Sequence, residues 1–210
     1  LHEHTPSDLL AQLYHALVLR TRVDPLSLSE VILGCVTQQG EQAANIAKTS
    51  ALRAGWPASV AGMTINRFCS SSIDAIALAA MKVNCGQTSA LVAGGVEMMS
   101  RVPLLADGAR VFADHDFGVN HQMLLMGAGA DLIASRGEMS HADLDAVAFG
   151  SHQRSLRAQK EERFRSIVPI ATSKGLVCSD ECVRPSLTPD RLAAMPSVFG
   201  DLGKAGSDQV

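Results

Sequence analysis

The chain has 210 residues, of which 47% are apolar and 19% are charged, and its formal net charge is −3. This composition is typical of a globular protein with a substantial core. The sequence has no basic stripe with interleaved aromatic residues, which argues against a nucleic-acid partner. No apolar run approaches the length of a membrane span, and five unevenly spaced cysteines argue for a reducing compartment, so we expect a cytoplasmic protein.

The first hundred residues are predicted to alternate between helices and strands. Thr5, Pro6 and Asp8 supply an N-cap, a first-turn proline and a capping-box acid for a helix that runs to Arg20. The further elements expected in this half are a strand at 30–36, a helix at 42–54, a strand at 60–66, a helix at 71–81 and a strand at 89–94. Successive β-α-β units predict an α/β fold with a parallel sheet between helices, and we assign residues 1–100 to it.

The composition shifts after Ser100. Residues 101–122 lack clear periodicity and are predicted to form a surface loop. We expect residues 101–200 to form a mostly helical insertion over the open end of the sheet, and 201–210 to begin a return to the core. Two helices are expected in the insertion: one at 124–136, and one that begins at a capping box of Ser140 and Asp143 and runs to about 161. A strand at 165–171, a turn at 173–175 and a helix from Thr188 to Pro196 are expected to follow.

Cys69 lies between the predicted strand at 60–66 and the predicted helix at 71–81. The helix is apolar almost all the way round, so we expect both elements to be buried. Ser71 and Asp74 form a capping-box pattern, which places the helix start within a residue or two of the sulfur. The N–H groups of a helix start favour the nucleophilic thiolate. From the residues alone, Cys69 is either a catalytic nucleophile or a small buried hydrophobe.

Two sequences in this region resemble motifs of one enzyme family. They are Asn-Arg-Phe-Cys-Ser-Ser-Ser at 66–72 and Gly-Gly-Val-Glu-Met-Met-Ser at 94–100. Both are similar, in order and spacing, to motifs of the thiolases, the acyl-coenzyme A acyltransferases, and the resemblance covers nearly the whole chain. It implies a layered α-β-α N-terminal half with a mostly helical loop domain inserted over the active site. It also implies that Cys69 is the residue that becomes acylated.

The resemblance further implies where coenzyme A, the co-substrate, binds; no permanently bound cofactor is expected. Arg184 aligns with a family arginine near the nucleotide phosphates, where a planar fork of donors suits phosphate oxygens. Met195 and Phe199 align with residues that line the adenine and pantetheine groove, and Met126 with a methionine in the cover of the acyl pocket. As alternatives, Arg184 is a surface charge, and Met195 and Phe199 are local core residues. Lys174 is a second candidate cation.

Several other polar or small residues are expected to have structural roles. The glycines at 94–95 allow a close backbone approach beside the active site, and Glu97 is interpreted as a buried hydrogen-bonding residue rather than a general base. His152 is interpreted as part of a solvated helix face, not as the partner of a Cys–His dyad. Cys178 and Cys182 are four residues apart, but the sequence holds no second ligand pair with zinc-site spacing, so we expect no metal.

The sequence departs from the family pattern at three points. Ser72 stands where many members have glycine, although some fatty-acid-degrading thiolases have a similar serine. Leu125 stands where biosynthetic acetoacetyl-type members have histidine, which favours degradative 3-ketoacyl substrates. The family's later asparagine, its Gly-His-Pro histidine and its second cysteine have no counterpart here. Because the chain also stops after Val210 without a closing element, we expect it to be part of a larger protein.

The function implied by the resemblance is a two-step acyl transfer. Cys69 would attack the keto carbonyl of a 3-ketoacyl-coenzyme A, release acetyl-coenzyme A and pass the acyl group to coenzyme A; the reverse reaction condenses two acyl units. One alternative is a non-catalytic thiolase-like module that binds acyl-coenzyme A or a partner subunit, and another is that Cys69 is merely a core residue. The family implies a homodimer or a homotetramer.

Overall fold

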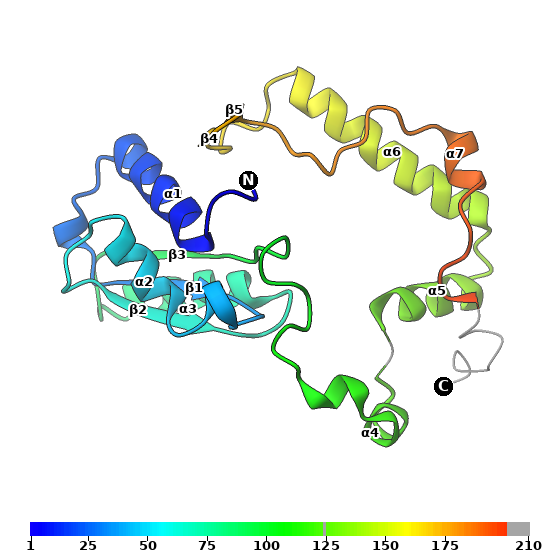
Figure 1. The fold of residues 1–210 in the computed structure, drawn as a ribbon, viewed down its shortest axis with the longest axis horizontal. Coiled ribbons are helices and arrows are strands. Elements are labelled where there is room, and N and C mark those ends of the chain that lie inside the picture. Colours follow the sequence, from blue (N-terminus) through cyan, green and yellow to red (C-terminus); the bar gives the residue numbers. More distant parts are fainter. Residues whose placement is uncertain (124, 201–210) are drawn as a thin grey trace. The chain divides into compact units, whose positions relative to one another are not determined.

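The structure of the protein is a computed structural model that describes residues 1–123 and 125–200 (Figure 1). By its internal contacts the chain divides into two units. The first consists of residues 1–109 and 168–178, and the second of the other described residues. The insertion expected at 101–200 therefore overlaps the second unit, but two of its segments, 101–109 and 168–178, belong to the first. The predicted return to the core at 201–210 lies outside the described residues.

A three-stranded parallel sheet forms the centre of the first unit. Its strands, in the spatial order β2-β1-β3, are β1 (Glu30–Gly34), β2 (Ala61–Ile65) and β3 (Val92–Gly95). Glu30 pairs with Ala61, and Val31 pairs with Val92. The predicted parallel sheet is confirmed, although each strand is shorter than its apolar run. Because the strands are parallel, the residues that follow them meet at one edge of the sheet.

Helix α1 (Pro6–Thr21) begins as its sequence predicts. The Thr5 hydroxyl accepts a hydrogen bond from Asp8 N at 3.2 Å, and the Asp8 carboxylate accepts one from Thr5 N at 3.2 Å. These reciprocal bonds satisfy two N–H groups that a helix start otherwise leaves unpaired. The capping box is therefore confirmed.

Helix α2 (Ile46–Arg53) is shorter than the predicted helix at 42–54. Its N-cap is Asn45, whose side chain accepts a hydrogen bond from Lys48 N at 3.1 Å. A 3-10 turn (Gly40–Gln42) occupies the residues before it, and another (Pro25–Ser27) precedes β1. The predicted end at Gly55 is confirmed, since this glycine has a φ of 74°.

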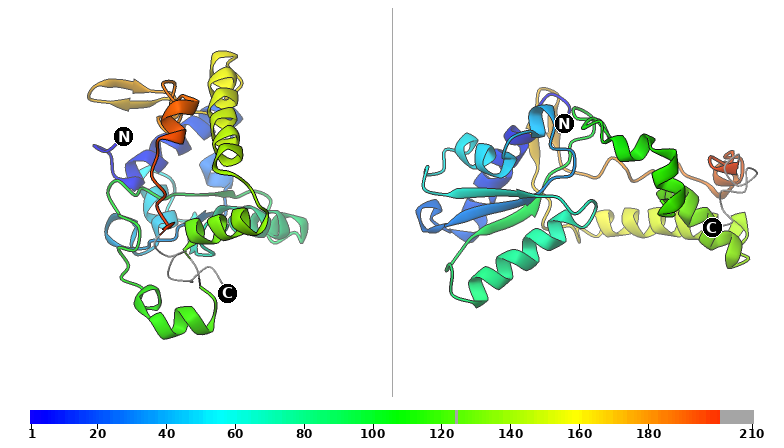
Figure 2. Two further views of the ribbon diagram at one scale, coloured as in Figure 1. Left: turned by 90° about the vertical axis from the view of Figure 1, so that its right-hand side faces the viewer. Right: turned by 90° about the horizontal axis from the view of Figure 1, so that it is seen from below.

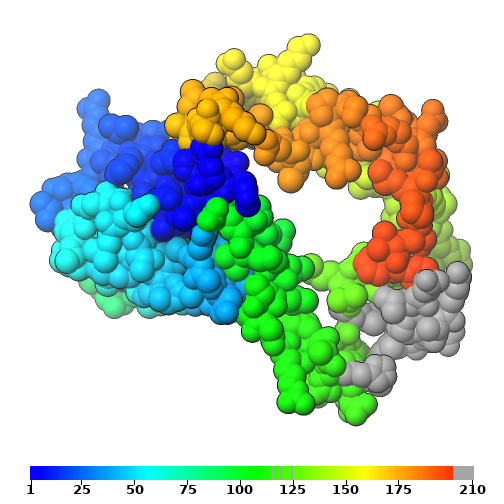
Figure 3. Space-filling view, in the orientation of Figure 1, coloured from blue at the N-terminus to red at the C-terminus, as the bar shows by residue number. Residues whose placement is uncertain are grey.

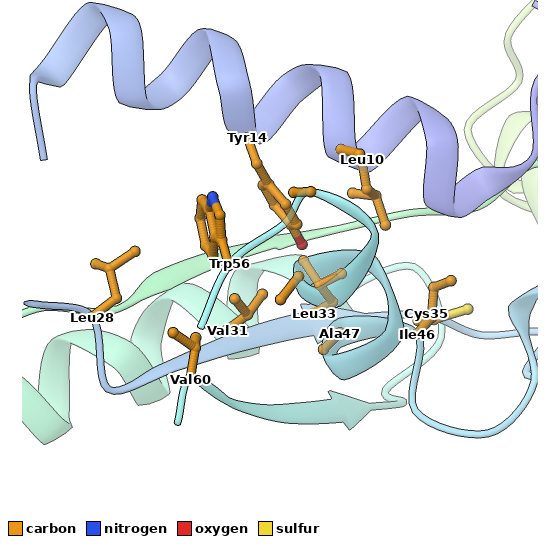
Figure 4. Packing of buried hydrophobic residues seen from close by; sticks show 13 residues of the cluster. Leu10, Tyr14, Leu28, Val31, Leu33, Cys35, Ile46, Ala47, Trp56 and Val60 are labelled. Atoms are coloured by element: carbon orange, nitrogen blue, oxygen red, sulfur yellow. The ribbon is translucent and has the colours of Figure 1, made fainter. Parts of the chain in front are cut away.

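The main core lies between the sheet and helices α1 and α2, while α3 (Ser71–Asn84) packs on the opposite face (Figure 2). Tyr14 stacks on Trp56 with ring centroids 4.7 Å apart. Figure 4 shows these rings above the buried strand residues Val31 and Leu33. The Tyr14 hydroxyl is 3.1 Å from Ser50 Oγ, and burial raises the pKa of Tyr14 to about 12. The core therefore fixes the sheet from which the candidate site extends.

Helix α3 is less buried than its sequence predicts. Ala75 is fully buried against the sheet, but Ile73 is 69% exposed and Ile76 is 56% exposed. The prediction that the whole helix is buried is therefore wrong for the described chain. The physical reason is that one sheet face covers only one stripe of a helix, and the rest of its apolar surface needs a second partner.

A hairpin of two short strands belongs to the first unit. Its strands are β4 (Ile170–Thr172) and β5 (Gly175–Val177), which pair antiparallel. The predicted turn at 173–175 is confirmed, but the strand expected at 165–171 begins only at Ile170. The Glu3 carboxylate accepts hydrogen bonds from Ser173 N and Oγ, both at 2.5 Å, so the hairpin lies against the N-terminal segment (Figure 3).

The second unit is mostly helical in its described part. Its elements are a 3-10 turn (Arg110–Ala113) and the helices α4 (His115–Asn120), α5 (Met126–Arg136), α6 (His141–Lys160) and α7 (Pro189–Ala193). The predicted loop at 101–122 is wrong where α4 forms. The capping box of Ser140 and Asp143 is confirmed, as is the Thr188 cap of α7. Across the described residues, every helix is too short or too polar to cross a lipid bilayer.

Candidate active site

The turn at 66–70, here called the nucleophile turn, connects β2 to α3 and carries Cys69. The Asn66 side-chain oxygen accepts a hydrogen bond from Phe68 N at 2.8 Å. The Ser71 hydroxyl accepts one from Arg67 N at 2.8 Å and donates one to Phe68 O at 2.6 Å. The side chains of Asn66, at the start of the turn, and Ser71, directly after it, therefore hold its backbone.

Phe68 has an unusual backbone conformation immediately before the cysteine. Its φ is 49°, in the left-handed region that non-glycine residues adopt only when the surrounding structure holds them there. Cys69 follows and is exposed, directly before the helix N-cap Ser70. The alternative that Cys69 is a core residue is therefore wrong for the described chain.

The predicted capping box of α3 is wrong. The N-cap is Ser70, whose side chain makes no capping hydrogen bond, and the Ser71 hydroxyl turns back into the nucleophile turn. Asp74 instead forms an ion pair with Arg67, in which Nη1 lies 3.1 Å from Oδ1 and 2.9 Å from Oδ2. These side chains stabilise the turn that precedes the helix rather than the helix start itself.

Two glycines let the start of α3 approach the sheet closely. A Cβ built at Gly34 would lie 2.6 Å from the backbone carbon of Ser71 and from Ser72 N. A Cβ at Gly95 would overlap the Ser72 hydroxyl, so the predicted close approach is confirmed there. Gly94 makes no such approach, because its nearest neighbour would be Leu33 Cδ2 at 3.9 Å. The helix start thus lies directly on the ends of β1 and β3.

Glu97 makes the hydrogen bonds that were expected of it, but it is exposed rather than buried. Its carboxylate accepts from Val36 N at 2.8 Å and from Gln42 Nε2 at 2.8 Å. Sequence reasoning missed this connection between the ends of β1 and β3. It also missed the Asn66 turn, for which a polar Asn directly after a strand is the signal that could have found it.

The residues predicted to contact coenzyme A lie in the second unit, except Lys174, which belongs to the first. Met126 is the first residue of α5 and is 80% exposed. Phe199 packs on the next residue, Gly127, where a Cβ would overlap its ring. Met195 follows α7 and is 44% exposed. The structure therefore brings Phe199 to the start of α5.

Arg184 is exposed, and its backbone connects it to α6. Its N–H donates a hydrogen bond to His152 Nδ1 at 3.2 Å. His152 therefore supports the segment that carries Arg184. Among the described residues, no group of three His, Cys, Asp or Glu side chains is arranged to hold a metal ion.

Comparisons with known proteins agree with the resemblance of the motifs at 66–72 and 94–100. The model of the thiolase N-terminal domain matches residues 1–207. The chain belongs to the thiolase family.

The similar thiolases extend well beyond the matched region. A β-ketoadipyl-CoA thiolase of Pseudomonas aeruginosa is 41% identical, over 92% of this chain and 54% of that protein. A 3-ketoacyl-CoA thiolase of Colwellia psychrerythraea is 34% identical, over 87% of this chain and 49% of that protein. The crystal structure of the Bacillus anthracis acetyl-CoA acetyltransferase matches with a TM-score of 0.79 at 32% identity, over 94% of this chain and 54% of that one. The chain thus spans about half the length of the curated thiolases it matches.

The cysteines of this thiolase chain differ in environment, and we expect their reactivity to follow. Cys35 is 1% exposed, and burial, with a smaller contribution from the Glu97 charge, raises the pKa of its thiol to about 11. At pH 8 in the folded protein, Cys35 should resist iodoacetamide because its thiol stays protonated and covered. Cys69 and Cys85, which are exposed, should react. Peptide mass spectrometry measures both rates, and rapid labelling of Cys35 before unfolding would contradict the prediction.

Proposed function

We propose that this chain supplies the nucleophile and part of the coenzyme A site of an acyl-coenzyme A acyltransferase. The reaction is thiolytic cleavage of a 3-ketoacyl-coenzyme A to acetyl-coenzyme A and a shortened acyl-coenzyme A, or the reverse condensation. The observation that carries the proposal is an exposed Cys69, held by a hydrogen-bonded turn at the carboxyl end of a parallel sheet in a thiolase chain. Ligand sites of open α/β sheets collect at this edge.

The chemistry follows from the thiolate. Cys69 attacks the keto carbonyl and forms a thioester, while the bond between the α and β carbons breaks and acetyl-coenzyme A leaves after protonation. Coenzyme A then takes the acyl group from sulfur, which restores the cysteine. Two displacements through a thioester replace one difficult step. The sequence holds no Gly-His-Pro motif, so the proposal assigns the base that activates Cys69 to a later segment of a longer protein.

The proposed ligand contacts come from the second unit. Arg184 binds the nucleotide phosphates of coenzyme A, since an acidic protein must collect positive charge where an anionic ligand binds. Met195 and Phe199 line the adenine and pantetheine groove, and Met126 covers the acyl pocket. Names of similar proteins, a β-ketoadipyl-CoA thiolase and a 3-ketoacyl-CoA thiolase, support a 3-ketoacyl substrate. We further propose a cytoplasmic homodimer or homotetramer.

Detection of the acyl-enzyme tests the proposal directly. When the full-length protein is incubated with acetyl-coenzyme A and quenched in acid, the peptide containing Cys69 should gain the mass of one acetyl group. The peptide containing Cys85, the exposed C-cap residue of α3, is the internal control and should gain no acetyl group. If Cys69 reacts with iodoacetamide but takes no acetyl group, the chain is a non-catalytic module and the proposal fails.

A further inference from the structure

Three loops at the carboxyl edge of the sheet are joined by one set of hydrogen bonds. The Glu97 carboxylate, after β3, accepts from Val36 N at 2.8 Å and from Thr37 N at 3.4 Å, both after β1. On the other side of the same backbone, Val36 O accepts from Asn66 Nδ2 at 3.3 Å. The peptide group between Val36 and Thr37 therefore faces Glu97 with its N–H and Asn66 with its C=O.

A buried glutamine holds the Glu97 carboxylate in place. Gln42 is fully buried, and its Nε2 donates to Glu97 Oε1 at 2.8 Å and to Thr37 O at 2.9 Å. Its Oε1 accepts from Met98 N at 2.6 Å. Because every polar atom of this side chain is used, Gln42 fixes the carboxylate against the β1 loop.

The set of bonds ends at the nucleophile. Asn66, which donates to Val36 O, accepts from Phe68 N through its other side-chain atom at 2.8 Å. Phe68 has the left-handed φ of 49° and is followed by Cys69. The orientation of Asn66 thus depends on the peptide that Glu97 holds.

We propose that Glu97 is a positioning residue for Cys69, acting through the Val36–Thr37 peptide and Asn66 on the nucleophile turn. This inference deepens the proposed function and rests on it for its catalytic consequence. The carboxylate keeps the peptide in the orientation that Asn66 needs, and Asn66 keeps Phe68 in its strained conformation. A misplacement of the sulfur by about an ångström lowers an acyl-transfer rate by about 10- to 100-fold.

The first measurement is the rate of Cys69 acylation by acetyl-coenzyme A in the full-length protein. Glu97→Gln keeps the side chain's size but places an NH₂ group among N–H donors, so at least one of them loses its acceptor. We expect acylation to slow about 10-fold or more. Glu162→Gln is the matched control, since it removes the same charge from an exposed glutamate in the second unit, and it should leave the rate unchanged.

The second measurement does not depend on activity. Amide hydrogen exchange across residues 66–71 reports whether the turn responds to Glu97, which lies about thirty residues away in the sequence. Glu97→Gln should accelerate exchange of the Phe68 amide about 5- to 10-fold, as expected for weakening one hydrogen bond. Asn66→Asp, which removes the donation to Val36 O, should do the same. Asn84→Asp is its control, with the same charge change at the far end of α3.

The double variant separates a connected relay from two independent structural effects. If Glu97 acts through Asn66, Glu97→Gln combined with Asn66→Asp should be no slower in acylation and no faster in exchange than Asn66→Asp alone. Additive effects would overturn the proposal, as would exchange in Glu97→Gln equal to that in Glu162→Gln. If the wild-type protein is not acylated at all, the proposed function fails, and exchange alone decides whether Glu97 positions the turn.

Discussion

Replacing Cys69 with alanine should lower the thiolysis of a 3-ketoacyl-coenzyme A by the full-length protein at least about a thousandfold, because no thioester can then form. The structure supports so large an effect, since Cys69 is the only cysteine in the nucleophile turn and is exposed at the sheet edge. Steady-state kinetics measures the loss. Because an exposed thiol contributes little packing, the variant should keep the wild-type unfolding midpoint.

The control for this prediction is a cysteine at the far end of the helix that follows Cys69. Cys85 is the C-cap residue of α3 and is exposed, so Cys85→Ala removes a comparable sulfur while leaving the nucleophile turn unchanged. It should retain turnover within about twofold, as is usual for surface substitutions away from a site. Undiminished turnover in Cys69→Ala would refute the nucleophile assignment, and equal losses in both variants would show that the cysteines act only through the fold.

The variant Gly34→Ala should destabilise the fold strongly. The new methyl group would lie 2.6 Å from backbone atoms of Ser71 and Ser72, which cannot rotate away as a flexible side chain would. The start of α3 must then move off the sheet, at a cost of about 3 kcal/mol in the free energy of unfolding. Urea denaturation followed by circular dichroism measures the change. Acylation of Cys69 should also slow, because the nucleophile turn is continuous with this helix.

Gly94 provides the matched control. It is also a glycine at the end of a strand in the same sheet, but a methyl group there would meet only Leu33 Cδ2 at 3.9 Å, an ordinary van der Waals distance. Gly94→Ala should therefore change the free energy of unfolding by less than about 1 kcal/mol. Similar losses in both variants would mean that strand glycine itself, rather than the approach of α3, explains the effect.

Local patterns predicted the parts of this chain whose structure depends on neighbouring residues. The capping boxes at Thr5 and Ser140 formed as expected, because both partners lie within one helical turn. The same pattern at Ser71 did not form a box. There the hydroxyl has a competing acceptor in Phe68 O, and Asp74 has a competing cation in Arg67. Such competition arises only after the turn has folded.

The sequence by itself determined the alternation of strands and helices, the parallel sheet, and the place of Cys69 between β2 and α3, because hydrophobic periodicity and short motifs encode these directly. Only the tertiary structure decided that Gly34 and Gly95 accept the start of α3, and that Glu97 meets Asn66 through the peptide after Val36. The physical reason is that these contacts join residues about twenty to sixty positions apart, which become neighbours only when the parallel strands align their carboxyl ends.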